Sequence, residues 1–128
     1  MNFISPELII KDVKQADTGK KVLYFQFIGK FTKRSSVEGS KAWTQELGKN
    51  DSLPFQFVWN CSDMTGFELS ARKEWYDAMQ GFKGQITKVY VVSNRIMIRS
   101  AAKVMLQFFG IASEIYQSPE DLPDHLQP

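Results

Sequence analysis

The segment at residues 55–83 constrains the fold more than any other part of the chain. A short apolar run at 55–59 is followed by polar residues at 60–63 and by a helical pattern that begins near Ser70. This combination predicts a buried strand, a loop and an amphipathic helix. In open α/β sheets, the loop after a buried strand is the usual place for a ligand or partner site. We therefore expect the polar side chains that follow this strand to form the functional surface.

Strand and helix patterns alternate along the rest of the chain. Strands are expected at residues 7–13, 21–29, 55–59, 86–92 and 113–116, and helices at 35–47, 70–82 and 95–109, with a last helical turn or two after Ser118. The sequence Asp17-Thr18-Gly19 predicts a turn between the first two strands. Both faces of the strand at 21–29 are apolar, which predicts that it is covered on both sides. The order β-β-α-β-α-β-α-β-α predicts a mixed, mostly parallel α/β sheet of about five strands covered by helices.

Polar residues mark the expected helix starts. Ser35 and Glu38 have the spacing of a capping box. Ser70 and Asn94 are candidate N-caps of the next two helices, and Gly110 can end the third. A phosphate on Ser70 would also be stabilised, because the start of a helix attracts negative charge. Ser70 is therefore predicted to be a cap, with phosphorylation as the alternative role.

Length and composition indicate one cytoplasmic domain that spans residues 1–128. Hydrophobic residues make up 43% of the chain and charged residues 23%, as in ordinary globular proteins. Cys61 is the only cysteine, which excludes a disulfide framework and fits a reducing compartment. The first residues lack the pattern of a signal peptide, and no apolar stretch is long enough for a membrane span.

The sequence contains no recognisable catalytic, metal or cofactor motif. It has no glycine-rich phosphate loop and no spacing typical of metal ligands. Cys61 has no nearby histidine in the sequence, and the single histidine, His125, lies in the tail, although a nucleophile needs a base to activate it. The three tryptophans fall on predicted core faces, which argues against an aromatic platform for nucleic acids. We expect a non-enzymatic protein with no cofactor, no metal and no nucleic-acid partner.

These residues and this order of elements resemble the STAS superfamily, and within it the SpoIIAA-like stand-alone domains related to bacterial anti-sigma-factor antagonists. The likeness covers nearly the whole chain. It is carried by residues 57–67, 70–75, 89–94 with the helix that follows, and 115–116. The resemblance implies a regulatory or sensory domain of bacterial type. Such a domain would bind a regulatory protein partner through the loop after the central strand and the start of the next helix.

Phosphorylated members of that family end the central strand with Asp and start the next helix with Asp-Ser-(Ser/Thr)-Gly. Here the strand ends in Asn60, and Leu69 occupies the usual phosphoacceptor position, with Ser70 one place later. The resemblance therefore implies partner binding without the usual phosphoacceptor. The predicted partner-binding residues are Asn60, Ser62, Asp63, Thr65, Gly66, Ser70, Arg72 and Lys73.

The helix expected at 95–109 has a wider apolar face than a helix that is covered on one side only. Apolar side chains occupy about half or more of its circumference, beside a polar strip that contains Arg99 and Lys103. The favoured explanation is burial between the sheet and neighbouring elements. Alternatively, this face contacts a second copy in a homodimer, a small apolar ligand or lipid, or the inner surface of the membrane. Its residues are Met97, Ala101, Val104, Met105, Phe108 and Phe109.

Overall fold

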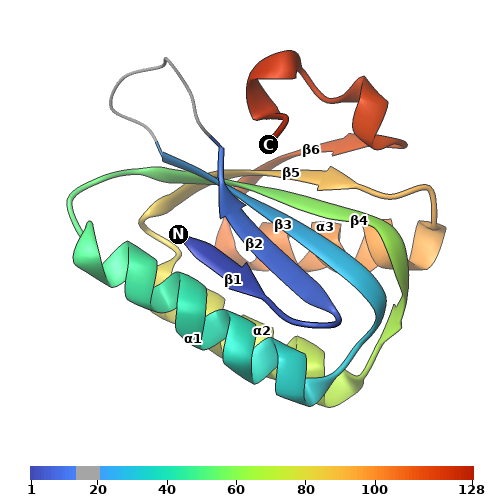
Figure 1. The fold of residues 1–128 in the computed structure, drawn as a ribbon, viewed down its shortest axis with the longest axis horizontal. Coiled ribbons are helices and arrows are strands. Elements are labelled where there is room, and N and C mark those ends of the chain that lie inside the picture. The colour runs from blue at the N-terminus through green and yellow to red at the C-terminus, as the bar shows by residue number, and fades with distance from the viewer. Residues whose placement is uncertain (14–20) are drawn as a thin grey trace.

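A six-stranded mixed sheet is the framework of the protein (Figure 1). The computed structural model describes residues 1–13 and 21–128, so the turn expected at 17–19 lies outside the described residues. The strands are β1 (Asn2–Ile4), β2 (Leu8–Asp12), β3 (Lys21–Phe31), β4 (Phe55–Phe67), β5 (Ile86–Val92) and β6 (Ala112–Tyr116). They lie side by side in chain order, antiparallel from β1 to β3 and parallel from β3 to β6. The predicted α/β class is confirmed, and β1 is an additional strand that the sequence pattern did not predict.

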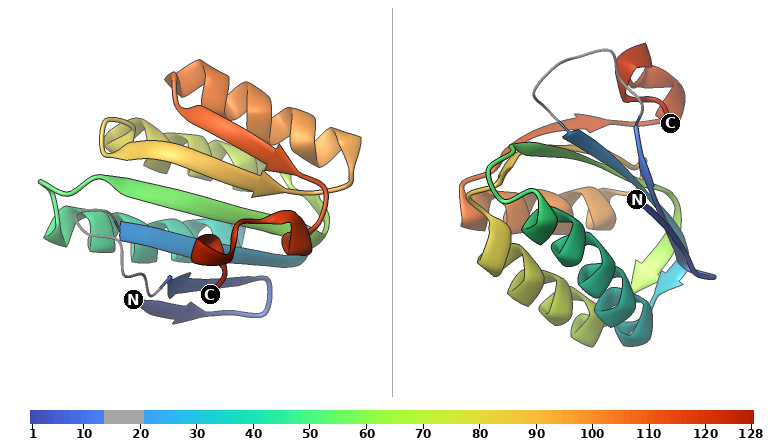
Figure 2. Two further views of the ribbon diagram at one scale, coloured as in Figure 1. Left: turned by 90° about the horizontal axis from the view of Figure 1, so that it is seen from above. Right: turned by 60° about the vertical axis from the view of Figure 1, so that its left-hand side comes forward.

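Three helices connect the parallel strands and cover one face of the sheet, as Figure 2 shows. Helix α1 (Lys33–Lys49) joins β3 to β4, α2 (Leu69–Phe82) joins β4 to β5, and α3 (Ile96–Phe109) joins β5 to β6. The chain after β6 covers the opposite face (Figure 1). There it forms two short helical turns of the 3-10 type, η1 (Pro119–Asp121) and η2 (Asp124–Leu126), where the sequence predicts a last helical turn or two.

Apolar residues on both faces of the sheet form two separate cores. Side chains alternate along a strand, so neighbouring residues of β3 face opposite sides. Leu23 and Phe25 belong to the larger core beneath the helices, whereas Val22 and Tyr24 belong to the smaller core. Leu126 of η2 contributes to the smaller core. The prediction that this strand is covered on both sides is confirmed.

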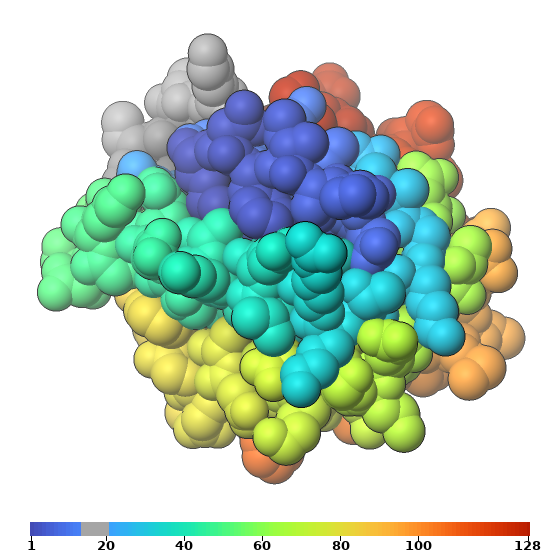
Figure 3. Space-filling view, turned by 60° about the horizontal axis from the view of Figure 1, so that its bottom comes forward, coloured from blue at the N-terminus to red at the C-terminus, as the bar shows by residue number. Residues whose placement is uncertain are grey.

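Trp75 of α2 lies at the centre of an aromatic cluster in the larger core. The rings around it come from β3, β4 and α1, with centroids 5.4 to 6.3 Å away: Phe25, Phe27, Phe31, Trp43 and Trp59. Most of these pairs are edge-to-face, the arrangement that the charge distribution of aromatic rings favours. The cluster fixes α1 and α2 against the sheet, and Figure 3 shows the two helices packed directly side by side.

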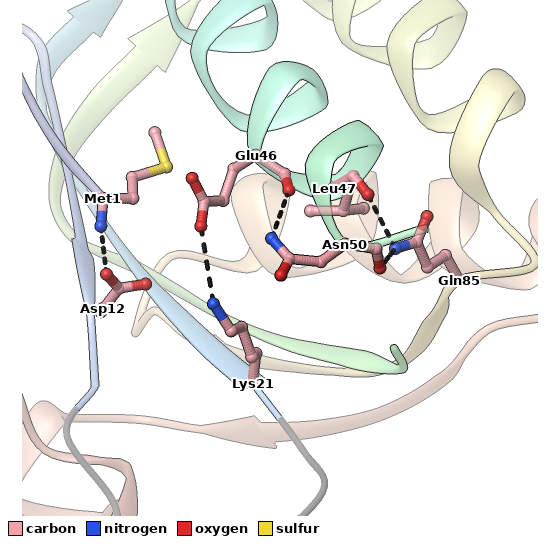
Figure 4. Close-up of polar contacts among 7 residues, drawn as sticks. All are labelled: Met1, Asp12, Lys21, Glu46, Leu47, Asn50 and Gln85. Atoms are coloured by element: carbon pink, nitrogen blue, oxygen red, sulfur yellow. Dashed lines mark hydrogen bonds and ion pairs between the residues drawn. The ribbon is translucent and has the colours of Figure 1, made fainter. Parts of the chain in front are cut away.

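At the amino ends of the parallel strands, side-chain hydrogen bonds fix the chain that follows α1 (Figure 4). Gln85 Nε2 donates to the main-chain oxygens of Leu47 at 3.0 Å and Asn50 at 2.7 Å, and Asn50 Nδ2 donates to the oxygen of Glu46 at 3.0 Å. Lys21 Nζ lies 3.8 Å from Glu46 Oε2. The protein itself thereby supplies donors to the carbonyls of Glu46 and Leu47 in the last turn of α1, where intrahelical donors run out.

The start of α1 differs from the predicted capping box. The helix begins at Lys33, and its N-cap is Thr32, whose hydroxyl accepts a hydrogen bond from the Ser35 amide at 3.3 Å. Glu38 is one turn too far along the helix to reach the cap. Its Oε2 instead lies 3.6 Å from Nε of Arg34. The predicted box at Ser35 is wrong because Thr32, three residues earlier, already has the extended backbone of an N-cap.

The ends of α3 agree with the prediction at one terminus only. The helix begins at Ile96 after Arg95, and Ser93 Oγ accepts a hydrogen bond from the Arg95 amide at 3.1 Å. The expected cap, Asn94, is not the N-cap residue. Gly110 ends the helix in the left-handed conformation, with a φ of 69°, as predicted.

Candidate functional site

β4 extends well beyond the residues that predict a strand. It is expected to end at Trp59 but continues to Phe67. β5 pairs with β4 only as far as Asn60, opposite Val92, so residues 61–67 pair with β3 alone among the described strands. Register shifts in the β3–β4 ladder accompany a bend, which carries this two-stranded ribbon toward the starts of α1 and α2 (Figure 1). The loop that the sequence predicts is therefore a bent extension of the sheet.

Asn60 is held beneath the surface. Its exposed fraction is 6%, and its Nδ2 donates to Tyr24 Oη at 2.9 Å. Its Oδ1 accepts hydrogen bonds from the amide of Ser62 at 3.1 Å and from the Ser62 hydroxyl at 2.7 Å. Burial raises the pKa of Tyr24, so the phenol stays neutral. The structure thus places Asn60 in the interior and half-buried Ser62 beside it.

The exposed polar residues of the bend lie farther along β4. Asp63 and Thr65 are exposed, and Gly66 is half-buried. Gln26 of β3 donates from Nε2 to Asp63 Oδ2 at 3.4 Å. Asp63 and Thr65 therefore reach the surface from a strand.

Glu68, rather than Ser70, is the N-cap residue of α2. Ser70 is the second residue of the helix and is exposed, and no side chain of the described residues caps this helix. The carboxylate of Glu68 serves α1 instead, because its Oε1 accepts a hydrogen bond from the Lys33 amide at 2.8 Å. The amide of Glu68 donates to the Phe31 carbonyl at 2.9 Å. The predicted capping role of Ser70 is wrong, and Glu68 joins the starts of the two helices.

A second carboxylate lies at the start of α1. Glu7 Oε1 accepts hydrogen bonds from Ser35 Oγ at 2.5 Å and from Thr32 Oγ1 at 2.6 Å. These hydroxyl donors lower the pKa of Glu7, with the Ser35 contact as the larger cause. No sequence motif indicates these roles of Glu7 and Glu68, since neither residue is near its partners in the sequence.

The first turn of α2 presents one apolar and three polar side chains to solvent. Leu69 is 72% exposed, and Ser70, Arg72 and Lys73 are exposed around it on the same helix. Lys73 Nζ lies 3.5 Å from Asp77 Oδ2, an exposed ion pair. The sequence contained a signal for this exposure, because Leu69 lies outside the apolar stripe that α2 turns toward the core.

An apolar cavity of about 70 Å³ lies between α2, α3 and the bent ends of β3 and β4. The side chains that line it are Phe27, Phe31, Trp59, Cys61, Met64, Phe67, Arg72, Trp75, Ile98, Ala101, Ala102 and Met105. Cys61 is buried in this wall, and burial raises the pKa of its thiol to about 12. The indole N–H of Trp59 is buried and has no acceptor among the described residues. This cavity could not be predicted from the sequence, because it depends on how far α2 and α3 lie apart.

The outer face of α3 is exposed along one apolar stripe. Met97, Val104 and Phe108 are 82%, 59% and 69% exposed, whereas Ala101 and Phe109 are half-buried and Met105 is buried. The favoured explanation, burial of the whole face, is therefore wrong for half of these residues. The residues of α3 that reach the core are Ile98, Ala102, Met105 and Leu106.

The structure does not bring the cysteine and the histidine together. Cys61 faces the larger core beneath the helices, whereas His125 belongs to η2 on the opposite side of the sheet. Within residues 1–13 and 21–128, no three His, Cys, Asp or Glu side chains form a group that could hold a metal ion. No described helix has the length and hydropathy needed to cross a membrane.

Solved structures that superpose on the chain settle its fold. An uncharacterised protein of the DUF3478 family from Shewanella loihica PV-4, which has a SpoIIAA-like fold, superposes with a TM-score of 0.73 at 15% identity over 99% of both chains. The chain has the SpoIIAA-like fold. The anti-sigma factor antagonist SpoIIAA in its unphosphorylated form is also similar, with a TM-score of 0.53 at 10% identity over 82% of this chain and 86% of that one. No protein-family model and no curated protein sequence matches the chain.

In this SpoIIAA-like fold, the predicted site residues belong to two different environments. Asn60 and Ser62 form a hydrogen-bonded group against Tyr24. The exposed residues, from Asp63 to Lys73, follow the bend of β4 into α2 at one end of the sheet (Figure 1).

Proposed function

We propose that this protein is a non-enzymatic regulatory domain that binds a protein partner through the first turn of α2 and the adjoining bend of β4. The observation that carries the proposal is the exposure of Leu69, an apolar side chain at the first position of α2. Interfaces commonly combine an apolar anchor with a polar rim. Here the rim consists of Asp63, Thr65, Ser70, Arg72 and Lys73, which are all exposed.

The SpoIIAA-like fold supports a regulatory role by analogy with an anti-sigma factor antagonist. Glu68 supports the proposed surface in another way, since its side chain and amide contact the start of α1 and the end of β3. Leu69 therefore extends from a fixed position, and little conformational freedom would be lost on binding. Asn60 and Ser62 act on this surface indirectly by holding the bend of β4.

The test is affinity purification from the source cell with wild type and Leu69→Asp. We expect Leu69→Asp to recover at least tenfold less of the partner than wild type. Its unfolding midpoint should equal that of wild type within experimental error, because Leu69 is largely exposed. Ser70→Glu probes the rim and should weaken the same interaction. Equal recovery of every copurifying protein by wild type, Leu69→Asp and Ser70→Glu would end the proposal.

A second candidate function is association with an anionic membrane surface through α3. The observation that favours it is the exposed stripe of Met97, Val104 and Phe108 on a helix whose polar strip carries the cations Arg99 and Lys103 and which has no acidic residues. A helix with an apolar face next to basic residues is suited to lie in the interface of an anionic bilayer.

Vesicle flotation distinguishes the two candidates, because each variant is the control for the other. Val104→Asp should abolish flotation with phosphatidylglycerol vesicles and leave partner recovery unchanged. Leu69→Asp should reduce partner recovery and leave flotation unchanged. Flotation that is absent in wild type, or unchanged in Val104→Asp, would remove the membrane candidate.

A further inference from the structure

The cavity between α2 and α3 has one charged residue in its wall, as far as the described residues show. Eleven of its twelve lining residues are apolar, aromatic or sulfur-containing, and the twelfth is Arg72. Arg72 is exposed, while Ala102 and Met105 on the opposite helix are buried. Because the wall of the cavity is almost wholly apolar, Arg72 lines it with the aliphatic stem of its side chain, and its exposed guanidinium lies outside the interior, at the mouth.

The volume of the cavity limits what can enter it. A cavity of roughly 150 Å³ holds benzene, whereas one water needs only about 10–15 Å³. At about 70 Å³, this cavity holds only the last few methylene groups of an alkyl chain, and because it is open, the rest of a longer chain would extend along its mouth. A water molecule in this cavity would form few hydrogen bonds, because so few polar groups line the wall.

Arg72 is free to bind an anion. In the part of the chain that the structure describes, it takes part in no salt bridge, whereas its neighbour Lys73 is paired with Asp77. Arg72 also lies in the first turn of α2, where the aligned peptide dipoles favour negative charge. A planar guanidinium matches a carboxylate with two parallel hydrogen bonds.

We propose that this cavity binds an aliphatic monocarboxylate of short to medium chain length. The alkyl end lies among Trp59, Met105 and Ala102, and the carboxylate binds Arg72 at the mouth. This inference does not depend on partner binding at Leu69, although Arg72 also belongs to the rim of that proposed surface. It also differs from the membrane candidate, because the ligand enters the inner side of α3 rather than covering its exposed stripe.

The test uses octanoate as the probe, with binding followed by calorimetry and by tryptophan fluorescence. Two of the three tryptophans, Trp59 and Trp75, line the cavity, so occupation should change their emission. We expect saturable binding to wild type at a stoichiometry of one, and binding to octanol at least tenfold weaker. The Arg72→Gln variant should bind octanoate with an affinity at least tenfold lower than that of wild type, and it should bind octanol with the same affinity as wild type.

Two further variants distinguish binding at this site from nonspecific hydrophobic binding. Ala101→Leu narrows the mouth and should weaken octanoate binding at least tenfold; Ala101 is half-buried, so folding tolerates the change. Lys73→Gln removes a neighbouring cation outside the cavity wall and should leave binding within twofold of wild type. Absent or non-saturable binding, equal affinity for octanol and octanoate, or an unchanged affinity in Arg72→Gln would overturn the inference. Binding of phosphatidylglycerol vesicles without binding of free octanoate would overturn it as well.

Discussion

Asn60 donates a hydrogen bond from Nδ2 to Tyr24 Oη at 2.9 Å, and this buried contact joins β4 to β3 where β4 begins its bend. The other side of the same amide accepts two hydrogen bonds from Ser62. Asn60 therefore uses its donor and its acceptor to fix the residues on which the candidate surface is built. A buried polar group of this kind is costly when one partner is removed.

Tyr24→Phe should destabilise the protein by about 1–2 kcal/mol, because it leaves the Asn60 amide buried without its acceptor. Urea unfolding at pH 7 measures this loss. The matched control is Tyr116→Phe, which removes a hydroxyl bonded to exposed Glu114 and should change the free energy of unfolding by less than about 0.5 kcal/mol. Equal effects of the two substitutions would show that the buried contact contributes nothing particular.

The order of the elements could be predicted from the sequence, but the path of β4 could not. Helices and strands follow their apolar periodicity, as the helix of Trp75 and Met79 shows. Polar residues such as Asn60 and Asp63 in succession usually indicate a loop. Here tertiary pairing with β3 overrides that preference, because the ladder from Ile28 to Phe31 supplies hydrogen bonds to the bend. The signal for a strand was present only in the scattered apolar side chains Cys61, Met64 and Phe67.

The predictions of the helix caps were wrong for a related physical reason. Local spacing favours Ser35 and Ser70, but the helices begin where the preceding strands end. The N-cap of α1, Thr32, lies next to the helix, but further hydrogen bonds at this helix start come from residues distant in sequence: Glu7, just before β2, and Glu68, the N-cap of α2. Contacts of this kind depend on the assembled sheet, and no short sequence motif encodes them.

Glu7→Gln should lower stability at neutral pH by about 1 kcal/mol, the scale of a partly exposed hydrogen bond to a charged acceptor. The donors Ser35 and Thr32 lower the pKa of Glu7 below its ordinary value of 4.5. The carboxylate therefore stabilises the fold above pH 4.5, and this contribution disappears as the pH falls through the lowered pKa. Urea unfolding of both proteins between pH 7 and pH 3 should show the difference shrinking with acid. A difference that is constant across this range would contradict the charge effect.

Gly39→Ala should destabilise the protein by about 1–3 kcal/mol through overpacking. A methyl group on Gly39 would overlap the side chain of Leu8, which is fully buried, with the Trp75 ring 3.8 Å away. Gly48→Ala in the same helix is the control, because nothing lies within 4 Å of the added carbon. It should stabilise the protein by about 0.5–1 kcal/mol, since alanine is the better helix former. Thermal unfolding of both variants checks the opposite signs.

Cys61 provides a test of burial in the wall of the cavity. Burial raises the pKa of its thiol to about 12, from an ordinary value of 9.0. In the folded protein the thiol therefore stays neutral between these values, whereas in the unfolded chain it ionises above pH 9. The unfolded state gains from that ionisation, so stability should fall as pH rises, by about 1.4 kcal/mol per pH unit from this one group.

Urea unfolding of wild type and Cys61→Ala between pH 8 and pH 11 isolates this contribution, because every other titrating group is common to both proteins. Wild type should lose stability more steeply above pH 9, while the offset between the proteins at pH 8 reflects only the lost packing of the sulfur. The native thiol should also react with iodoacetamide at pH 8 at least about 100-fold more slowly than in urea, since the thiolate is the nucleophile. Parallel pH profiles together with rapid labelling of the native protein would mean that Cys61 faces solvent.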